Sequence, residues 1–510
     1  MHAKTHSIIS HGMNGITIVV ECVVTKGLPA MIIVGIANKA VDESRERIRS
    51  AFANSMVAFP KKRITINLAP GDMPKHGTNL DLAIAVAILS ATEQIRTNVD
   101  DSVFIGELGL SGELRPVHGI VGIVLQARKL GFKKCFIPSL NLDQASLVPN
   151  IELYPVATLQ DIYNHLGGSN QLSPVRHIEP QAIVAPLDKS EVDMQEVIGH
   201  SIAKRALEIA AAGGHNILLS GPPGTGKSML AKAFKGILPP MSHEEMLEVT
   251  QLASLTGSNN DTVVTERPFR APHHTASDIS LIGGGQNPRP GEISLSHQGV
   301  LFLDEFPEFS RAAIESLRQP LEDRKIRIAR ASGTIEYPAH FILIATANPC
   351  PCGYWGTTKE CVCMPYQISN YQRKLSGPIT DRIDMFIEVE EIDHSRLLAD
   401  SSGTRDTTQI RLSVQKAREI QCRRYGNQLA INGDMSNKQI KKFANLSVNA
   451  LELINLAGEK LHISARNYMH TVRVARTIAD IEQSKAIEVQ HISEALQYRR
   501  KQVAFDAIST

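Results

Sequence analysis

The amino-acid sequence predicts a multidomain α/β protein whose carboxyl-terminal region is entirely helical. Its 510 residues suffice for roughly three domains, each with a hydrophobic core of its own. Strand and helix patterns alternate over residues 1–170, whereas residues 408–510 carry almost only helical patterns. Between these regions a glycine-rich loop joins a short apolar strand to a helix, which is the arrangement of a P-loop domain.

Four segments follow from these patterns. The first domain comprises residues 1–170. A proline-containing stretch without periodicity, 171–190, is expected to be a linker. The P-loop domain comprises residues 191–393, and the helical domain follows a polar break and comprises residues 408–510.

The composition is ordinary for a globular protein, with 43% hydrophobic residues, 21% charged residues and a net charge of +2. This small net charge excludes a chain-wide polybasic surface, so any nucleic-acid site must come from local clusters of cations. No apolar run is long enough to span a bilayer, and the first residues are too interrupted for a signal peptide. We therefore expect a cytoplasmic protein whose seven cysteines are thiols or metal ligands.

Local patterns predict individual elements within the first domain. Apolar runs rich in β-branched residues predict strands at 16–24 and 63–68. The spacing of apolar residues predicts amphipathic helices at 81–91 and 120–130.

The P-loop motif, Gly-Pro-Pro-Gly-Thr-Gly-Lys-Ser, occupies residues 221–228. Its glycines allow backbone amides to approach phosphate oxygens, and the helix that follows adds positive partial charge at its start. Lys227 is expected to reach the β- and γ-phosphates, and the Ser228 hydroxyl is expected to hold Mg²⁺. The motif therefore predicts a site for a nucleoside triphosphate such as ATP. The predicted nucleotide-binding residues are Gly221, Pro222, Pro223, Gly224, Thr225, Gly226, Lys227, Ser228 and Met229.

Two further apolar strands end in polar residues that suit the same site. The strand at 299–303 delivers Asp304 and Glu305, which is the Walker B arrangement. Asp304 is expected to support Mg²⁺, and Glu305 is expected to polarise the attacking water. The strand at 341–347 ends at Asn348, which is expected to position that water.

These motifs, in this order, resemble those of the AAA+ ATPases. Residues 322–337 alternate charged and apolar side chains around a Ser-Gly break, and they predict a β-hairpin. This hairpin resembles the one before sensor 1 in the AAA+ branch that contains magnesium chelatase and the MCM helicases. Residues 273–298 lie where that branch inserts a second hairpin into helix 2.

A narrower resemblance rests on three motifs together with the first domain. The motifs are Arg-Ala-Pro-His-His at 270–274, Asn-Pro-Cys-Pro-Cys-Gly at 348–353 and Ser-Gly-Pro-Ile-Thr-Asp-Arg-Ile-Asp at 376–384. They resemble the ComM/YifB family of magnesium-chelatase-like ATPases over nearly the whole chain. The resemblance implies a homo-hexameric DNA helicase that hydrolyses ATP with Mg²⁺ and promotes branch migration during recombination of transforming DNA. It implies single-stranded and branched DNA as partners, together with recombination or competence proteins.

The resemblance also implies roles for two arginines. Arg382 matches the arginine finger of this branch, which stabilises charge on the γ-phosphoryl group of a neighbouring subunit. A structural ion pair of Arg382 with Asp381 or Asp384 is the alternative. Arg473 matches the sensor 2 arginine of the helical lid.

The assignment of Arg473 leaves two neighbours open, because Arg466 and Arg476 lie close to it in the sequence. A site shared between subunits requires an oligomer, so a monomer should hydrolyse ATP poorly.

The motifs at 71–81 and 106–117 resemble the Lon protease domain, which implies a ribosomal S5 domain 2-like α+β fold for the first domain. An ATP-dependent protease is therefore an alternative function. Asn79 and Val121 occupy the positions of the catalytic serine and lysine, and neither can perform their chemistry. The domain is then expected to be a scaffold or a DNA-binding platform, with the cations at 61–63 either contacting phosphates or forming a solvated rim.

Four cysteines form a C-x-C…C-x-C pattern next to Asn348. They are Cys350, Cys352, Cys361 and Cys363. Four thiolates in a short loop suit tetrahedral Zn²⁺ as a structural ion. A reduced loop without metal and a redox-sensitive pair of thiols are the alternatives.

Four cations of the predicted hairpin are candidate contacts for DNA. They are Arg324, Lys325, Arg327 and Arg330. In a ring the hairpin would project into the channel and contact the phosphate backbone without reading bases. Ion pairs with Glu322, Asp323 or Glu336 are the alternative. A second functional class, a magnesium chelatase motor subunit that remodels a protein partner, is also open, although such subunits are expected to lack the Lon-like domain.

Overall fold

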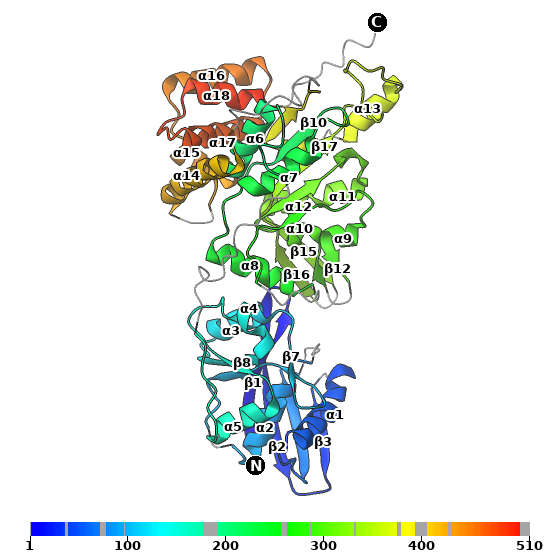
Figure 1. The fold of residues 1–510 in the computed structure, drawn as a ribbon, viewed down its shortest axis with the longest axis vertical. Helices are drawn as coiled ribbons and strands as arrows, with labels where there is room; N and C mark the ends of the chain where they lie inside the picture. The colour runs from blue at the N-terminus through cyan, green and yellow to red at the C-terminus, as the bar shows by residue number, and fades with distance from the viewer. Residues whose placement is uncertain are drawn as a thin grey trace.

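The structure is a computed structural model that describes residues 2–35, 39–71, 78–95, 97–176, 192–256, 263–285, 288–330, 333–374, 379–392, 405–426 and 430–499. Figure 1 shows an amino-terminal region below, a central region above it and a helical carboxyl-terminal region beside the top of the central one. The predicted linker lies outside the described residues from residue 177 onward, as do parts of the motifs at 71–81 and 376–384.

The amino-terminal region is built on one mixed seven-stranded sheet with the order β3-β4-β2-β1-β5-β8-β9. The pairs β1–β2 and β2–β4 are antiparallel, and the other neighbours in the sheet are parallel. The strands are β1 His2–His11, β2 Asn14–Thr25, β3 Ala30–Val34, β4 Arg63–Ala69, β5 Ser102–Phe104, β8 Lys134–Pro138 and β9 Glu152–Val156, with a separate small pair, β6 Glu107–Leu108 and β7 Leu114–Arg115. The helices are α1 Lys39–Asn54, α2 Asp81–Ala91, α3 Ile120–Lys129, α4 Leu142–Ala145 and α5 Leu159–Gly167.

The two strands and two helices predicted for this region are present, but α2 is not amphipathic. Ten of its eleven residues are buried, because the helix lies against β1 and β2 and is also contacted by α1. Its only charged residue, Asp81, is buried and accepts hydrogen bonds from Arg47 at 2.8 Å and 3.2 Å. Only Asp81 and Ser90 are polar in this segment, and a helix that is apolar all round is typically buried, so the prediction of an exposed face was wrong here.

The central region contains a five-stranded parallel sheet with the order β11-β14-β17-β10-β18. Its strands are β10 Ile217–Ser220, β11 Phe269–Arg270, β14 Val300–Leu303, β17 Ile342–Ala347 and β18 Met385–Glu388. Its main helices are α6 Ser201–Gly213, α7 Lys227–Ile237, α8 His243–Ser254, α11 Arg311–Ser316, α12 Arg318–Asp323 and α13 Pro365–Lys374. Because all five strands are parallel, their carboxyl ends lie at one edge of the sheet and their amino ends at the other.

Two small antiparallel pairs project from this region. The predicted hairpin consists of β15 Lys325–Arg330 and β16 Gly333–Pro338. It begins later than predicted, because Glu322 and Asp323 form the last turn of α12. The insert at 273–298 contains the pair β12 Gly283–Gly284 and β13 Arg289–Pro290, between the short helices α9 Asp278–Ile282 and α10 Glu292–Leu295.

The carboxyl-terminal region is helical, as predicted. Its helices are α14 Thr407–Tyr425, α15 Asn437–Phe443, α16 Val448–Lys460, α17 Ala465–Ile481 and α18 Val489–Gln497. Asp406, Ser436, Ser447 and Ser464 each accept a hydrogen bond at a helix start, which explains where four of these helices begin. The predicted class, a mixed α/β chain with a parallel sheet and a helical carboxyl-terminal region, is confirmed at this level.

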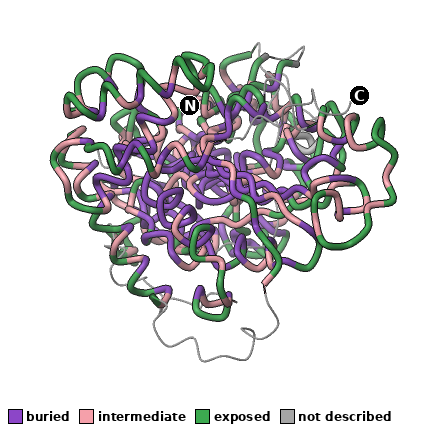
Figure 2. Tube along the Cα trace, turned by 90° about the horizontal axis from the view of Figure 1, so that it is seen from above, coloured by how far each residue is buried: buried purple, intermediate pink, exposed green. Residues whose placement is uncertain are grey.

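The helical region and one face of the parallel sheet share a hydrophobic core. Ile217 of β10 and Phe234 of α7 belong to the same buried cluster as Val414 of α14 and Ile478 of α17. Seen from above, the buried residues gather along the centre of the molecule and exposed helices surround them (Figure 2). Among the described residues, no helix combines the length and apolar character that crossing a membrane would need.

The amino-terminal region contacts the central region through the turn between β1 and β2 and through α3. The backbone carbonyl of Met13 in that turn accepts a hydrogen bond from Gln251 of α8. Met13 also joins a buried cluster of the central region that contacts Ile335 of the hairpin. A Cβ on Gly12 would lie 2.7 Å from the Cγ2 atom of Ile335, so the turn and the hairpin are in close contact. Figure 1 shows α3 and β1 meeting α8 and β16 at this junction.

Candidate functional site

The P-loop lies at the carboxyl end of β10, between β17 and β18, and leads into α7 at Lys227. Gly224 and Gly226 have φ values of 82° and 80°, a left-handed backbone that favours glycine. A Cβ on Gly221 would lie 2.2 Å from the carbonyl oxygen of Val389, so glycine is required there by close approach. The loop and the start of α7 together form the anion-binding arrangement of a helix N-terminus. The predicted nucleotide-binding residues in this segment are Gly221, Pro222, Pro223, Gly224, Thr225, Gly226, Lys227, Ser228 and Met229.

The ammonium group of Lys227 lies between the loop and the end of β17. It donates hydrogen bonds to the carbonyls of Gly221 at 2.6 Å and Pro222 at 2.7 Å, and to Asn348 Oδ1 at 3.3 Å. Burial lowers the pKa of Lys227, and the nearby carboxylates of Asp304 and Glu305 oppose that shift. The arrangement therefore keeps a positive charge at the position where a phosphate chain would lie on the loop.

Asp304 and Ser228 come together as a pair of oxygen ligands. The Ser228 hydroxyl donates to Asp304 Oδ2 at 3.0 Å, and the Thr346 hydroxyl donates to Asp304 Oδ1 at 2.5 Å. Thr346 also accepts a hydrogen bond from the backbone amide of Glu305 at 2.9 Å. Hydroxyl and carboxylate oxygens are the ligands that Mg²⁺ prefers, so Ser228 and Asp304 could hold this ion.

Thr346 is a residue of this site that was not predicted from the sequence. Its signal was present, because it is a hydroxyl in an otherwise apolar strand, one position before the strand ends. In the structure, Thr346 fixes both the carboxylate of Asp304 and the backbone of Glu305.

Glu305 has an unusual backbone and a half-exposed carboxylate. Its φ is 52°, which is uncommon for a residue other than glycine and is found often at functional sites. Its side chain is 53% exposed, and His274 Nδ1 lies 3.8 Å from its Oε2 atom. His274 in turn lies against the ring of His273. The motif at 270–274, used only as a family marker in the sequence, thus contributes a histidine beside the predicted water-activating carboxylate.

The segment after Asn348 brings four cysteines together. The sulfurs of Cys350 and Cys352 are 3.3 Å apart, and Cys361 Sγ lies 3.7 Å and 3.5 Å from them. With Cys363, all four sulfurs lie within 4.8 Å of one another. This cluster could therefore bind a metal ion.

Arg382 lies at the opposite edge of the sheet. It ends a short 3₁₀ turn just before β18, and its carbonyl accepts a hydrogen bond at 3.1 Å from Asn216, which precedes β10. Its guanidinium is buried and forms an ion pair with Glu322 at 2.5 Å. The ion pair therefore involves the end of α12, rather than the Asp381 or Asp384 carboxylates considered from the sequence.

Arg473 lies on α17 at this same edge. Its charge is attracted by the buried Asp384 and by Asp434, whereas Arg324 and Arg466 repel it. Burial lowers the pKa of Arg473, and its Nε atom has no hydrogen-bond partner within the described part of the chain.

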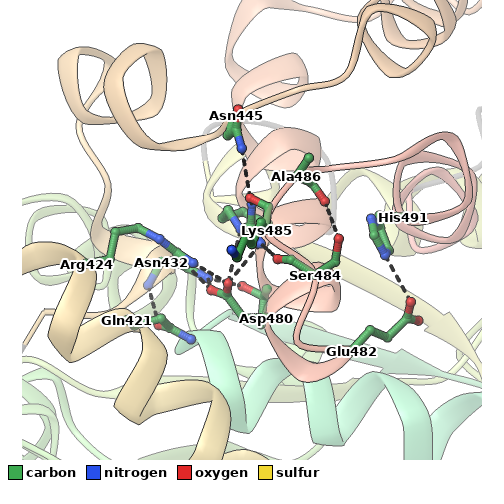
Figure 3. A network of polar contacts seen from close by, with 12 residues as sticks. Gln421, Arg424, Asn432, Asn445, Asp480, Glu482, Ser484, Lys485, Ala486 and His491 are labelled. Atoms are coloured by element: carbon green, nitrogen blue, oxygen red, sulfur yellow. Dashed lines mark hydrogen bonds and ion pairs between the residues drawn. The ribbon is translucent and has the colours of Figure 1, made fainter.

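The two arginines near Arg473 are engaged elsewhere. Arg466 pairs with Glu322 at 3.0 Å. Arg476 is fully buried and donates to Asp480 and to the carbonyls of Ser484 and Lys485. Figure 3 shows these three acceptor residues close together. Arg476 therefore has a structural role in the helical region.

The buried Asp384 anchors the amino edge of the sheet. It accepts hydrogen bonds from the amide of Asn216 at 2.8 Å and from His470 of α17, and His215 lies 3.9 Å away. Burial alone would raise the pKa of Asp384, but the His470 and His215 charges and the hydrogen bonds outweigh it and lower the pKa to about 2. Burial also lowers the pKa of His215 to about 4.

The cations predicted to contact DNA differ in their surroundings. Lys325 and Arg327 are exposed on β15, and both pair with Glu336 of β16, at 2.5 Å and 2.9 Å. Arg324 precedes the hairpin and binds Asp434 of the helical region at 2.7 Å. The Arg330 side chain lies outside the described residues, although its backbone forms the end of β15.

The amino-terminal region contains no Ser–Lys dyad at the positions that the Lon resemblance indicates. Asn79 is buried and donates a hydrogen bond at 3.0 Å to the carbonyl of Ile8, and Val121 is fully buried in α3. Both side chains pack within the region. The cations at 61–63 are exposed.

Three families match successive parts of the chain. The family described as "Magnesium chelatase, subunit ChlI" matches residues 193–397, and its carboxyl-terminal counterpart matches residues 404–499. The family described as "Subunit ChlI of Mg-chelatase" matches residues 20–141.

Several curated proteins resemble the chain. The Competence protein ComM of Haemophilus influenzae is 41% identical over 98% of this chain and 97% of its own length. The Uncharacterized protein YifB of Salmonella typhimurium is 40% identical over 98% of this chain and 97% of its own length. A Lon protease of Azospirillum brasilense is 27% identical over 149 residues, which are 28% of this chain and 18% of that protein.

Proposed function

Because the chain belongs to the ComM/YifB family of magnesium-chelatase-like AAA+ ATPases, we propose that it is an ATP-driven motor that moves on DNA. In this proposal it forms a homo-hexameric ring in the cytoplasm and acts as a helicase that promotes branch migration during recombination of transforming DNA. The name of a relative that matches over nearly its whole length, the Competence protein ComM, supports DNA as the partner and recombination or competence proteins as associates.

The convergence of Lys227, Ser228, Asp304 and Asn348 supports ATP hydrolysis. Lys227 would bind the β- and γ-phosphates, and its bond to Asn348 already links the P-loop to the neighbouring strand. Bound Mg²⁺ would neutralise charge that develops on the phosphates, with Ser228 and Asp304 as its holders.

Glu305 would accept a proton from the attacking water, and Asn348 would orient that water. The half-exposed carboxylate of Glu305 is consistent with access to solvent, and its left-handed backbone fixes its direction. His274, 3.8 Å away, would restrain the carboxylate.

The single observation that supports a ring of subunits is the distance of Arg382 and Arg473 from the P-loop of their own chain. The P-loop follows the carboxyl end of β10, whereas Arg382 and Arg473 lie beyond its amino end, and a four-residue strand is about 13 Å long. An arginine that stabilises the γ-phosphoryl group must touch it. We infer that Arg382 and Arg473 complete the nucleotide site of a neighbouring subunit.

The hairpin supports DNA contact at the ring channel. Lys325 and Arg327 are exposed and share a single carboxylate, so the pair keeps a net positive charge. Phosphate contacts of this kind give sequence-independent binding that weakens with salt. Arg324 contributes less, because it is bound to Asp434.

The decisive experiment measures branch migration on a synthetic four-way junction by the purified chain. We expect strand exchange that requires hydrolysable ATP and is absent with a non-hydrolysable analogue. If ATP turnover is insensitive to single-stranded and branched DNA and the protein does not bind either, the motor acts on another partner.

The second candidate function is that of a chelatase-like motor that remodels a protein partner, and the family descriptions favour keeping it. This function predicts a rate of ATP turnover that does not change when DNA is added. Proteolysis is disfavoured, because Asn79 and Val121 cannot supply a nucleophile and a base.

A further inference from the structure

The four cysteines after Asn348 have the spacing of ligands around one ion. Four sulfurs at the corners of a tetrahedron about Zn²⁺, at about 2.3 Å from it, lie about 3.8 Å apart. The separations among Cys350, Cys352 and Cys361 are 3.3–3.7 Å, close to this value. A disulfide would require about 2.0 Å between two sulfurs, so these distances do not describe covalent pairs.

The surroundings of the sulfurs also suit thiolate ligands. The backbone amide of Trp355 donates to Cys350 Sγ at 3.3 Å, and the amide of Cys352 donates to Cys363 Sγ at 3.4 Å. Such donors commonly support metal-bound ligands. With four thiolates the coordination shell is full, which is typical of a structural rather than a catalytic ion.

The segment that carries these cysteines has little else to hold it in shape. Between the end of β17 and the start of α13 it contains no helix or strand within the described residues. Val362 and Met364 are exposed, with 81% and 61% of their surfaces accessible. An ion that joins both ends of such a loop would supply the order that packing does not.

This loop touches the P-loop directly. Gly353 has φ 86°, and a Cβ at this position would lie 2.6 Å from Pro223 Cδ. On one side the loop begins next to Asn348, which accepts a hydrogen bond from Lys227. On the other side it leads into α13, whose Lys374 donates to the carbonyl of Pro307 beyond the Walker B strand at 2.8 Å.

We propose that Cys350, Cys352, Cys361 and Cys363 bind one structural Zn²⁺ and that the loop closed by this ion holds Pro223 and Asn348 at their positions around the nucleotide. Zinc binding by the four cysteines does not depend on the proposed function. The role of the loop in positioning Pro223 and Asn348 rests on the proposed nucleotide site. Gly353 is then a positioning residue, because it acts on the site through Pro223.

The first test measures zinc in the full-length protein purified without added metal or chelator. We expect about one equivalent per chain, and its loss in the C352S and C361S variants. C422S is the matched control, because Cys422 lies on α14 outside the cluster, and it should keep its zinc. Less than half an equivalent in the unaltered chain, iron in place of zinc, or an unchanged content in C361S would overturn the ion site. This result does not depend on ATP hydrolysis.

The second test compares two glycine substitutions in the same loop. Gly353→Ala places a methyl group against Pro223, whereas Gly356→Ala has the same left-handed strain, with φ 77°, and no atom within 4 Å of its new Cβ. We expect both variants to retain zinc and equal melting temperatures. The kcat for ATP should fall in Gly353→Ala by about tenfold or more relative to Gly356→Ala, because small displacements at a reaction site have large effects on rate.

Equal kcat values for these two variants, with zinc retained, would overturn the positioning role and leave the ion site in place. If the unaltered chain contains zinc but shows no ATP turnover, the proposed function fails while the ion site stands. In that case the positioning is tested by the affinity for a fluorescent ATP analogue, which should fall in Gly353→Ala alone.

Discussion

The two ends of the parallel sheet both carry charged side chains, but they hold them in opposite ways. At the carboxyl end, Lys227 is held by backbone carbonyls and an amide, and Glu305 is half exposed. At the amino end, Asp384 is buried and bound by His470 and by the amide of Asn216. The carboxyl end keeps its charges available to a ligand, whereas the amino end uses most of its charges to join the helical region to the sheet.

This difference explains why Arg382 and Arg473 are placed at the amino end. A rigid joint fixes the direction in which the arginines point, and a fixed direction is what a contact across a subunit boundary needs. The following predictions test this division, from the largest expected effect to the smallest.

The largest effect is expected for Arg382→Ala. Removing an arginine finger should lower ATP turnover by about 10³-fold or more while ATP binding is retained. Steady-state hydrolysis and binding of a fluorescent ATP analogue measure the two effects. The matched control is Glu322→Gln, which removes the carboxylate paired with Arg382 in the structure and should keep most of the turnover.

Mixing two inactive variants tests whether the ATP site is shared between neighbouring subunits or lies within one chain. Rings that combine Arg382→Ala chains with Lys227→Ala chains should regain part of the activity, since some interfaces then contain both intact residues. No recovery on mixing, with both variants assembling normally, would place the arginine and the P-loop in the same chain's site.

At the carboxyl end, Glu305→Gln should lower turnover by about 10²-fold or more, because a general base contributes about 10²–10⁴-fold. ATP binding should be unaffected or stronger. Glu308→Gln, three residues along and also exposed, is the control and should behave as the unaltered chain. Normal turnover of Glu305→Gln would assign water activation to another group, of which His274 is the nearest.

A third comparison uses two arginines on one helix. Arg476→Met should destabilise the helical region by about 3–5 kcal/mol, because it leaves the buried Asp480 without one of its cations. Arg473→Met should change stability by about 1 kcal/mol or less, since the Nε of Arg473 has no partner among the described residues, but it should lower ATP turnover. Hydrogen exchange of the α17 amides measures the change in stability of each variant. A large loss of protection in Arg473→Met would make this arginine structural as well.

The contact between the helical region and the amino end of the sheet should lose stability in acid. The pKa of His215 is about 4 in the folded chain and about 6.5 when unfolded, so the unfolded state takes up a proton first as the pH falls. Stability is therefore full above about pH 6.5 and is lost towards pH 4, by about 3 kcal/mol at most. Urea unfolding measured across this range should show the slope, and His215→Gln should flatten it. An equal slope in both proteins would assign the acid sensitivity to other groups.

The smallest effect concerns the hairpin. Lys325→Ala and Arg327→Ala should each weaken DNA binding a few-fold and reduce the dependence on salt by about one ion. Glu336→Gln should strengthen binding, because it releases both cations. Fluorescence anisotropy with single-stranded DNA over a series of salt concentrations measures all three. Identical salt slopes would remove the hairpin from the DNA path.

The sequence was informative where a short segment contains the whole signal. The P-loop, the strand that ends in Asp304 and the helical carboxyl-terminal region all depend on local patterns, and the structure contains each element. The start of the hairpin was predicted too early, because a charged and apolar alternation at Glu322 does not reveal the end of α12. The helix at 81–91 was given an exposed face, although its almost wholly apolar sequence is typical of a helix that is buried on all sides.

The amino end of the sheet could not have been predicted in this way. Asp384, His215 and His470 come from three separate segments, and no spacing in the sequence links them. The separation of Arg382 from the P-loop likewise follows from strand direction rather than from motif identity. Thr346 could have been predicted as a site residue, because it is a hydroxyl residue in an otherwise apolar strand.

The division of the hydrophobic cores has a consequence for dissecting the gene. Residues 2–176 enclose clusters that are almost wholly their own, so a fragment that starts after the linker loses little of its interior. Residues 405–499 share one interior with α6 and α7, and a fragment that stops before them would uncover the faces of α6 and α7 against which α14 packs. Deletion alleles should therefore yield soluble products when they remove the beginning of the coding sequence and insoluble ones when they remove its end.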